Sequence, residues 1–315
     1  MKKTNEKTCP ICDTLLVSNG REFSLDELLA MWKPVVFTQM TIDEHKTQGE
    51  YTQLHICPSC GLGIFIPQII GTSDFYVDLL KNESTYAYSE EKWDFDEALK
   101  DAEGCKWVME IGCGPGNFLE KLKPYVENVY GTEYNRRALK VARDRGLNIF
   151  GMKDESAERL KGRFDIVFSF HVLEHVPDPV AFIQEMLSWV KPGGKIGISV
   201  PNMDGPVKYI NPCVSNMPPH HATQWRLHTF KALAERLGLE LERVAYEPLT
   251  AESHYYYSIY WVESVFPDNS FIMRRLRSIG RMAFSLFFKI LSMFGKDSTP
   301  LLRGQSIYVL LSKRD

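Results

Sequence analysis

Between residues 106 and about 205, short apolar runs alternate with segments whose apolar residues recur at helical spacing. The apolar runs predict β-strands, and residues 164–170 are apolar almost throughout, as in a strand buried on both faces. One of the intervening helices is predicted to start at Asp178 and Pro179, which suit the N-cap and first helical positions. This alternation is typical of an α/β fold with a parallel sheet. The predicted strands here are residues 107–111, 128–132, 147–152, 164–170 and 195–200.

The last part of the chain carries a different pattern. Residues 240–246 and 306–311 predict two further strands. Between them, apolar residues in 271–295 recur at intervals of three and four, and the segment holds arginines and a lysine but no acid. One apolar stripe with a cationic remainder is typical of a helix lying in a membrane interface. A helical insertion packed on the sheet or on a second subunit fits the same pattern.

Composition places the chain among ordinary globular proteins. Of its 315 residues, 44% are hydrophobic and 24% are charged, which excludes a disordered or low-complexity chain. The length predicts two domains, one of them small. A net charge of −3 argues against broad contact with nucleic acid, because such proteins are usually basic. The sequence has no apolar leader and no run of 18 apolar residues, so we expect a cytoplasmic protein. We also expect peripheral contact with a membrane through residues 271–295.

Four of the seven cysteines form two Cys-x-x-Cys pairs, Cys9 with Cys12 and Cys57 with Cys60. Two such turns supply the four thiolates that structural zinc prefers. The alternatives are two buried cysteine pairs without metal, or a redox pair, although the βαβ setting of thioredoxin-type motifs is missing. Because 44 residues separate the pairs, more than in a compact ribbon, the intervening segment must hold structure of its own. We predict a structural zinc ribbon with Zn²⁺ as a cofactor.

A glycine-rich turn follows the first predicted strand of the sheet. Gly112, Gly114 and Gly116 let the backbone approach a ligand closely and turn into the next helix. Glu133 ends the next strand, where a carboxylate can accept both hydroxyls of a ribose. This pair of features also fits a dinucleotide, but the third glycine comes one residue earlier than in that fingerprint. Glu110, inside the first strand, would repel a pyrophosphate and suits a cationic amino group.

Three segments together resemble a known family. The sequence Val-Met-Glu-Ile-Gly-Cys-Gly-Pro-Gly at 108–116, the segment 164–179 and Val-Lys-Pro-Gly-Gly at 190–194 resemble motifs of class I S-adenosylmethionine-dependent methyltransferases, in the same order. The resemblance covers residues 105–245. It implies a Rossmann-like seven-stranded sheet with helices on both faces, S-adenosyl-L-methionine as cofactor, and methyl transfer as the activity.

The resemblance also implies roles for individual residues. Glu110 would orient the amino end of the cofactor, and Glu133 would hold its ribose. Tyr134 would lie against adenine, and His171 would sit beneath the methionine end. Two acids in 151–155 are both candidates for reading the adenine amine, and the sequence does not choose between them. The full set expected to bind the cofactor is Glu110, Gly112, Gly114, Gly116, Glu133, Tyr134 and His171.

The acceptor side of this fold normally comes from the loops after the fourth and fifth strands. His220 and His221 lie in the proline-rich loop after the fifth, and they are our candidates for a general base and its neighbour. The alternative is that they only fix the turn. A histidine in this loop together with an N-terminal zinc ribbon resembles the arrangement in methyltransferases of nucleotide-linked sugars. Those enzymes carry a Glu-His pair at this place in the loop, where this chain has His220 and His221, and they have a further C-terminal domain.

We therefore expect a sugar acceptor, either nucleotide-linked or part of a lipid-linked glycan, methylated at carbon or oxygen in polysaccharide biosynthesis. The alternatives are an RNA base methyltransferase and a non-catalytic cofactor-binding module. The expected domains are a zinc ribbon at 1–67, a helical aromatic connector at 68–104, the methyltransferase core at 105–250, an amphipathic helical insertion at 251–300 and the last core strand at 301–315.

Overall fold

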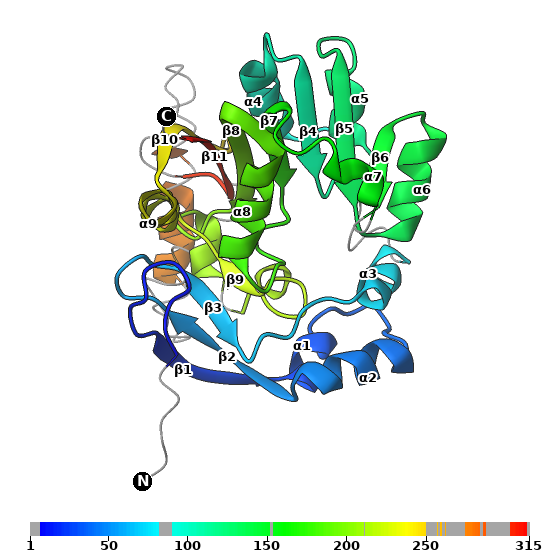
Figure 1. Cartoon of the computed structure of the whole chain (residues 1–315). Coiled ribbons are helices and arrows are strands. Elements are labelled where there is room, and N and C mark those ends of the chain that lie inside the picture. The colour runs from blue at the N-terminus through cyan, green and yellow to red at the C-terminus, as the bar shows by residue number, and fades with distance from the viewer. Residues whose placement is uncertain are drawn as a thin grey trace.

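Two sheets organise the chain in a computed structural model (Figure 1). The structure describes all residues except 1–6, 82–89, 152–153, 211, 250–256, 258, 260–261, 263–274, 284–285, 288–302 and 314–315. Most of the insertion predicted at 251–300 therefore lies outside the described residues. Residues 275–283 within it are helical. No helix in the described part of the chain is long and apolar enough to cross a membrane.

The larger sheet has seven strands in the order β10-β11-β8-β7-β4-β5-β6. Strands β4 to β8 pair in parallel, whereas β11 runs antiparallel to both β8 and β10. This confirms the predicted Rossmann-like α/β fold. Its strands are β4 (Trp107–Ile111), β5 (Asn128–Glu133), β6 (Asn148–Gly151), β7 (Phe164–Phe170), β8 (Val190–Pro201), β10 (Leu239–Tyr246) and β11 (Ser306–Lys313).

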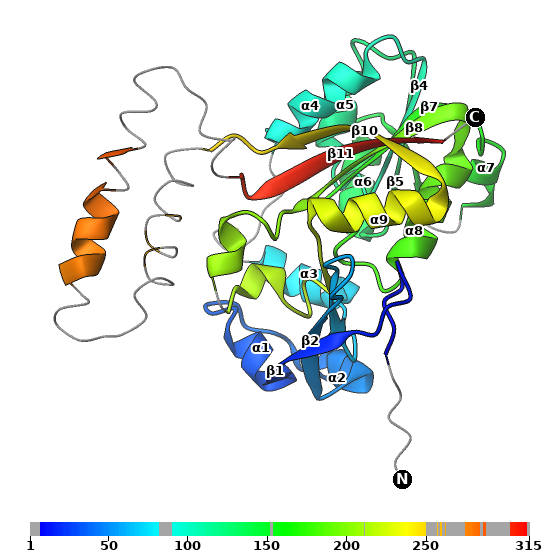
Figure 2. The same cartoon turned by 90° about the vertical axis from the view of Figure 1, so that its left-hand side faces the viewer.

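Helices cover both faces of this sheet, because alternate residues of each strand point to opposite sides. On β4, Val108 packs with α4 and α5, whereas Met109 packs with α8 and α9. Figure 2 shows α4 and α5 on one side of β10 and β11, and α9 on the other. The helices of this part are α4 (Trp93–Ala102), α5 (Asn117–Leu122), α6 (Arg136–Asp144), α7 (Glu155–Glu158), α8 (Pro179–Trp189) and α9 (Leu227–Leu237). As predicted, α8 begins with Asp178 at its N-cap and Pro179 in its first turn.

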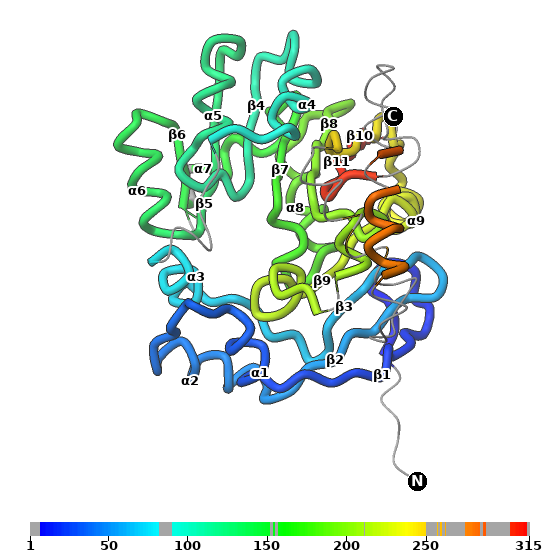
Figure 3. The backbone as a smooth tube through the Cα atoms, turned by 180° about the vertical axis from the view of Figure 1, so that it is seen from behind, coloured from blue at the N-terminus to red at the C-terminus, as the bar shows by residue number. Residues whose placement is uncertain are grey.

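The smaller sheet has four strands in the order β1-β2-β3-β9, which are β1 (Val17–Ser24), β2 (Tyr51–Ile56), β3 (Gly63–Ile66) and β9 (Thr223–Gln224). Three helices accompany it: α1 (Leu25–Ala30), α2 (Gln39–Gln48) and α3 (Ser73–Leu80). Seen from behind in Figure 3, this N-terminal unit lies below the larger sheet. Strand β9 comes from the loop after β8, and Gly63 of β3 pairs with Gln224. The two sheets therefore share one segment of chain, which sequence patterning did not predict.

Residues 93–102 of the segment predicted as a connector form α4, which belongs to the core of the larger sheet. Phe95 and Ala98 are buried against Phe118 and Phe168. Arg243 of β10 also holds this helix. Its guanidinium donates to Asp101 at 2.6 and 3.2 Å and to Glu97 Oε2 at 2.5 Å.

We expect Arg243→Met to lower the free energy of unfolding by about 2 kcal/mol, because the largely buried Asp101 carboxylate loses its cation. Urea denaturation followed by circular dichroism measures this change. Lys140→Met is the matched control, since Lys140 pairs with Asp144 on the exposed surface of α6 and should contribute at most about 0.5 kcal/mol. Equal losses in the two variants would contradict the assignment.

Candidate functional site

The strand order reverses between β4 and β7, and ligands of open α/β sheets bind at the carboxyl ends of strands at such a point. Gly112 follows β4 and His171 follows β7. Gly112 has φ +76°, and a Cβ there would stand 2.4 Å from Val172 Cγ2. Gly116 has φ +87°, and its Cβ would meet Leu147 Cδ1 at 2.1 Å. Both positions combine a positive φ with no room for a Cβ, so both require glycine. The structure therefore has the tight turn between β4 and α5 that the sequence predicts.

Glu133, at the end of β5, reaches this turn. Its Oε2 accepts a hydrogen bond from the Gly114 N–H at 2.7 Å, and its Oε1 accepts one from the Asn135 N–H at 2.5 Å. Burial raises the pKa of the Glu133 carboxyl. The remaining lone pairs of the carboxylate are available to hydroxyl donors such as those of a ribose. Tyr134 is the next residue and is 67% exposed, so its ring is accessible to a planar ligand.

Glu110 is a buried carboxyl on β4 whose Oε2 has no hydrogen-bond partner among the described residues. Burial raises the pKa of Glu110 well above its usual range, and the nearby Glu133 and Asp94 add to this shift. Such an acceptor is costly unless a donor or cation meets it. The cationic amino group of S-adenosyl-L-methionine would satisfy it, so the donor set and the glycine turn fit the cofactor that the sequence predicted.

His171 occupies a left-handed backbone conformation with φ +54°, which is uncommon outside glycine and often marks a functional position. Its Nε2 lies 3.2 Å from Asp94 Oδ2, and its Nδ1 lies 3.4 Å from Glu174 Oε1. Burial lowers the pKa of His171, but the two carboxylates outweigh it and raise the pKa to about 9. The imidazole is therefore a cation at neutral pH, held between two buried anions.

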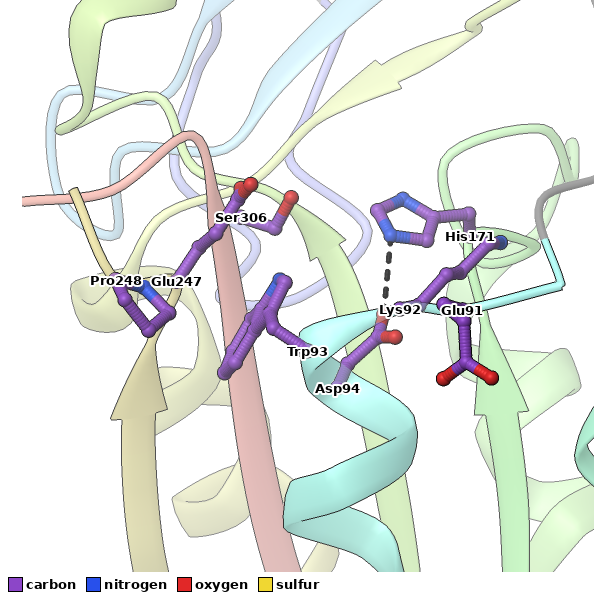
Figure 4. Close-up of a pocket in the computed structure, with 8 residues that line it drawn as sticks. All are labelled: Glu91, Lys92, Trp93, Asp94, His171, Glu247, Pro248 and Ser306. Atoms are coloured by element: carbon purple, nitrogen blue, oxygen red, sulfur yellow. Dashed lines mark ion pairs between the residues drawn. The ribbon is translucent and has the colours of Figure 1, made fainter. Parts of the chain in front are cut away.

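A pocket of about 330 Å³ opens beside this histidine, large enough for a small molecule (Figure 4). It lies between the segment leading into α4, the end of β7, the end of β10 and the start of β11. His171 is the predicted cofactor residue that reaches it, whereas the glycine turn and Glu133 do not line it. Its lining residues are Glu91, Lys92, Trp93, Asp94, His171, Glu247, Pro248 and Ser306.

The predicted catalytic residues His220 and His221 are both buried and lie outside this pocket. They pack with His175, and the three rings have centroids 4.4–4.7 Å apart. Burial lowers the pKa of His220 and His221 well below the usual range. Glu174 stands between the two groups, because its Oε1 is also 3.9 Å from His221 Nε2. A catalytic role for His220 and His221 stays a prediction.

From the sequence we assigned no role to Asp94 and no functional role to Glu174 or His175. Asp94 belongs to α4, which precedes the first strand of the sheet, so no local spacing connected it with His171. At Glu174 the only signal in the sequence was the motif Leu173-Glu174-His175, which follows β7.

The four predicted metal ligands Cys9, Cys12, Cys57 and Cys60 come together, with their sulfur atoms within 4.8 Å of one another. The Sγ atoms of Cys9 and Cys60 are 3.5 Å apart, and those of Cys12 and Cys57 are 3.3 Å apart. Tetrahedral zinc with Zn–S bonds of about 2.3 Å places sulfurs roughly 3.8 Å apart, close to this arrangement. Backbone N–H groups also point at the sulfurs, as from Ile11 to Cys9. The donor set therefore fits the structural zinc that the sequence predicted.

Comparison with known proteins finds a match to a family described as a methyltransferase domain, over residues 94–244. The ubiquinone biosynthesis O-methyltransferase of Erwinia tasmaniensis is 36% identical over 104 residues, which cover 31% of this chain and 43% of that protein. The protein of the same name from Colwellia psychrerythraea is 37% identical over 102 residues, covering 30% and 42%. The chain thus spans less than half the length of these curated relatives.

Among solved structures, a SAM-dependent methyltransferase from Archaeoglobus fulgidus is 18% identical, with a TM-score of 0.46, and the alignment covers 71% of this chain and 95% of that one.

The sugar acceptor predicted from the sequence is wrong. The matching relatives are named for O-methylation in ubiquinone biosynthesis, not for sugars or polysaccharides. The prediction rested on two loop histidines behind a zinc ribbon. In the structure these histidines pack against His175 and not in the pocket, so they gave no information about what the pocket holds.

We expect Glu133→Gln to weaken binding of S-adenosylhomocysteine roughly tenfold, because a neutral amide accepts hydroxyl hydrogen bonds less strongly than a carboxylate. Isothermal titration calorimetry measures the dissociation constant. Glu127→Gln is the matched control, since Glu127 is exposed just before β5. An unchanged affinity in Glu133→Gln would show that the ribose is held elsewhere.

Stability should depend on pH through His171. Since its folded pKa of about 9 exceeds the unfolded value of about 6.5, the stabilisation is complete below pH 6.5 and is lost as the pH rises through 9. The charged groups around it are Asp94, Glu174 and Glu247, with Lys92 beside Asp94.

Thermal melts of wild type and His171→Gln across pH 6 to 10 test this expectation. The difference in melting temperature should shrink over that range. A constant difference would mean that His171 is neutral throughout.

Proposed function

We propose that this chain, whose residues 94–244 match a methyltransferase-domain family, uses S-adenosyl-L-methionine to methylate a hydroxyl oxygen of a small molecule. The observation that carries the proposal is the pocket of about 330 Å³ beside His171, at the end of the sheet where the glycine turn lies. Its size suits a small acceptor. The names of the matching relatives, which specify O-methylation, support oxygen as the methylated atom.

On the cofactor side, this chain's residues bind and orient. The turn through Gly112 and Gly114 brings backbone next to the ligand, and Glu133 accepts hydrogen bonds from the ribose. Glu110 would receive the amino group on its unpartnered Oε2. The bound cofactor supplies a methyl group on a positively charged sulfur, and methyl transfer requires acceptor, methyl and sulfur in line. The fixed turn and the locked His171 provide that alignment.

On the acceptor side, Trp93 and Pro248 form an apolar wall (Figure 4), which suits a flat apolar body such as a hydroxylated ring. Two pocket carboxyls differ in their surroundings. Asp94 is paired with His171, whereas Glu247 is hydrogen-bonded by Ser306, and burial raises the pKa of Glu247. A carboxylate with a raised pKa is the better proton acceptor. We assign Glu247 as the group that takes the proton from the acceptor hydroxyl.

The test is release of S-adenosylhomocysteine by the full chain with a panel of hydroxylated aromatic compounds. Sugar nucleotides and RNA are separate pools. We expect turnover with members of the aromatic panel. Turnover only with sugars would contradict the flat apolar acceptor. Turnover only with RNA, or with no hydroxyl compound despite cofactor binding, would contradict the proposal as a whole.

With an active compound, Glu247→Gln should lower kcat by about 10²-fold or more, because general-base catalysis is lost, and should leave cofactor affinity unchanged. Glu240→Gln is the control, since Glu240 is exposed on β10, the strand that Glu247 follows. Equal kcat in the two variants would remove Glu247 from the reaction.

A further inference from the structure

Three histidines from two loops form a cluster outside the pocket. His175 follows β7, whereas His220 and His221 follow the short helix η2 (Val214–Asn216). One ring nitrogen of each lies within 4.8 Å of the others. In the part of the chain that the structure describes, two groups of His, Cys, Asp or Glu side chains are spaced to hold a metal ion. They are this cluster and the four cysteines. His220 is 7% exposed and His221 is 5% exposed, whereas His175 is half-buried, so two of the three rings are almost fully shielded from water.

Hydrogen bonds fix the protons on two of these rings. His221 Nδ1 lies 3.0 Å from Asn216 Oδ1, and His175 Nδ1 lies 2.5 Å from the backbone carbonyl oxygen of His220. Both oxygens can only accept, so each Nδ1 carries a proton, and in a neutral ring the lone pair is then on Nε2. An imidazole that donates from one nitrogen to a carbonyl and binds an ion through the other is the usual arrangement in metal sites.

The surroundings suit a cation. The Glu174 carboxylate is 1% exposed and lies 3.9 Å from His221 Nε2, which places a buried anion next to the cluster. His220 and His221 stack at 20° with centroids 4.4 Å apart, so the two rings lie side by side in the cluster. Metal-bound imidazole nitrogens at about 2.1 Å from an ion lie no more than roughly 4.2 Å apart, so small side-chain rotations suffice.

We propose that His175, His220 and His221 hold a divalent transition-metal ion, with the charge of Glu174 beside it. Imidazole ligands favour Zn²⁺, Cu²⁺, Ni²⁺ and Fe²⁺ over Ca²⁺ or Mg²⁺, and three of them leave a fourth position open. The site is separate from the cysteine site and does not depend on the acceptor proposed above. As ligands, His220 and His221 would direct their lone pairs at the ion and would not serve as general bases.

The ion would also join the two parts of the molecule. The Tyr76 hydroxyl of α3 is 3.0 Å from His175 Nδ1, and the ring of Trp32 meets His220 edge-on at 5.4 Å. Both residues belong to the N-terminal unit, whereas the histidines follow strands β7 and β8 of the larger sheet. Binding of the ion should therefore stabilise the folded chain, since an unfolded chain offers no preformed site.

The first test is the zinc content of the purified full chain after dialysis against zinc, measured by inductively coupled plasma mass spectrometry. We expect two equivalents in wild type and one in His220→Phe, which keeps a flat ring but removes a ligand. His55→Gln, which changes a half-buried histidine on β2, is the matched control and should keep two equivalents. One equivalent in wild type, or two equivalents in His220→Phe, would overturn the proposal.

The second test needs no variant, and so it decides the matter even if His220→Phe fails to fold. Cadmium-113 NMR of wild type loaded with cadmium should show two resonances, one in the thiolate range and one in the range of nitrogen ligands. A thiolate resonance alone would overturn the proposal. Both readouts are independent of turnover, so failure of the metal site and failure of the proposed methyl transfer are distinguishable.

Discussion

Glu174 is the residue on which the arrangement of the site depends. Its buried carboxylate lies between His171 and His221, and its backbone carbonyl accepts hydrogen bonds from the amides of Ala222 and Thr223. A buried carboxylate is stable only where cations or donors compensate it, so it fixes what stands around it. The pocket beside His171 and the histidine cluster are therefore linked through one carboxylate oxygen, Glu174 Oε1.

The same contacts explain why the small N-terminal sheet is part of the site. The amides that bind the Glu174 carbonyl immediately precede or belong to β9, which pairs with β3. Cys9, Cys57 and Cys60 are in turn buried in the same hydrophobic cluster as Trp225 and Phe230. A metal at the cysteines would stabilise the strands that hold β9, and β9 positions the loop that carries His220 and His221. The cysteine pairs thus support the histidine cluster from a distance.

Local patterns predicted the strands of the larger sheet, the glycine turn and the two cysteine pairs, because each depends on neighbours in the sequence. The pairing of Asp94 with His171 and of β9 with β3 joins residues that are far apart in the chain, and no local period reports such contacts. The acceptor was predicted wrongly for the same reason. Two adjacent loop histidines look alike whether they line a pocket or pack against His175.

The central claim is that the methyl group goes to an oxygen of a small molecule. The most direct measurement supplies S-adenosylmethionine labelled with carbon-13 in its methyl group, together with the full chain and an extract of small hydroxylated compounds. Carbon-13 NMR of the product then identifies the labelled atom's neighbour. We predict a methoxy resonance in the small-molecule fraction. A label bonded to carbon, or found only in macromolecules, would contradict the account.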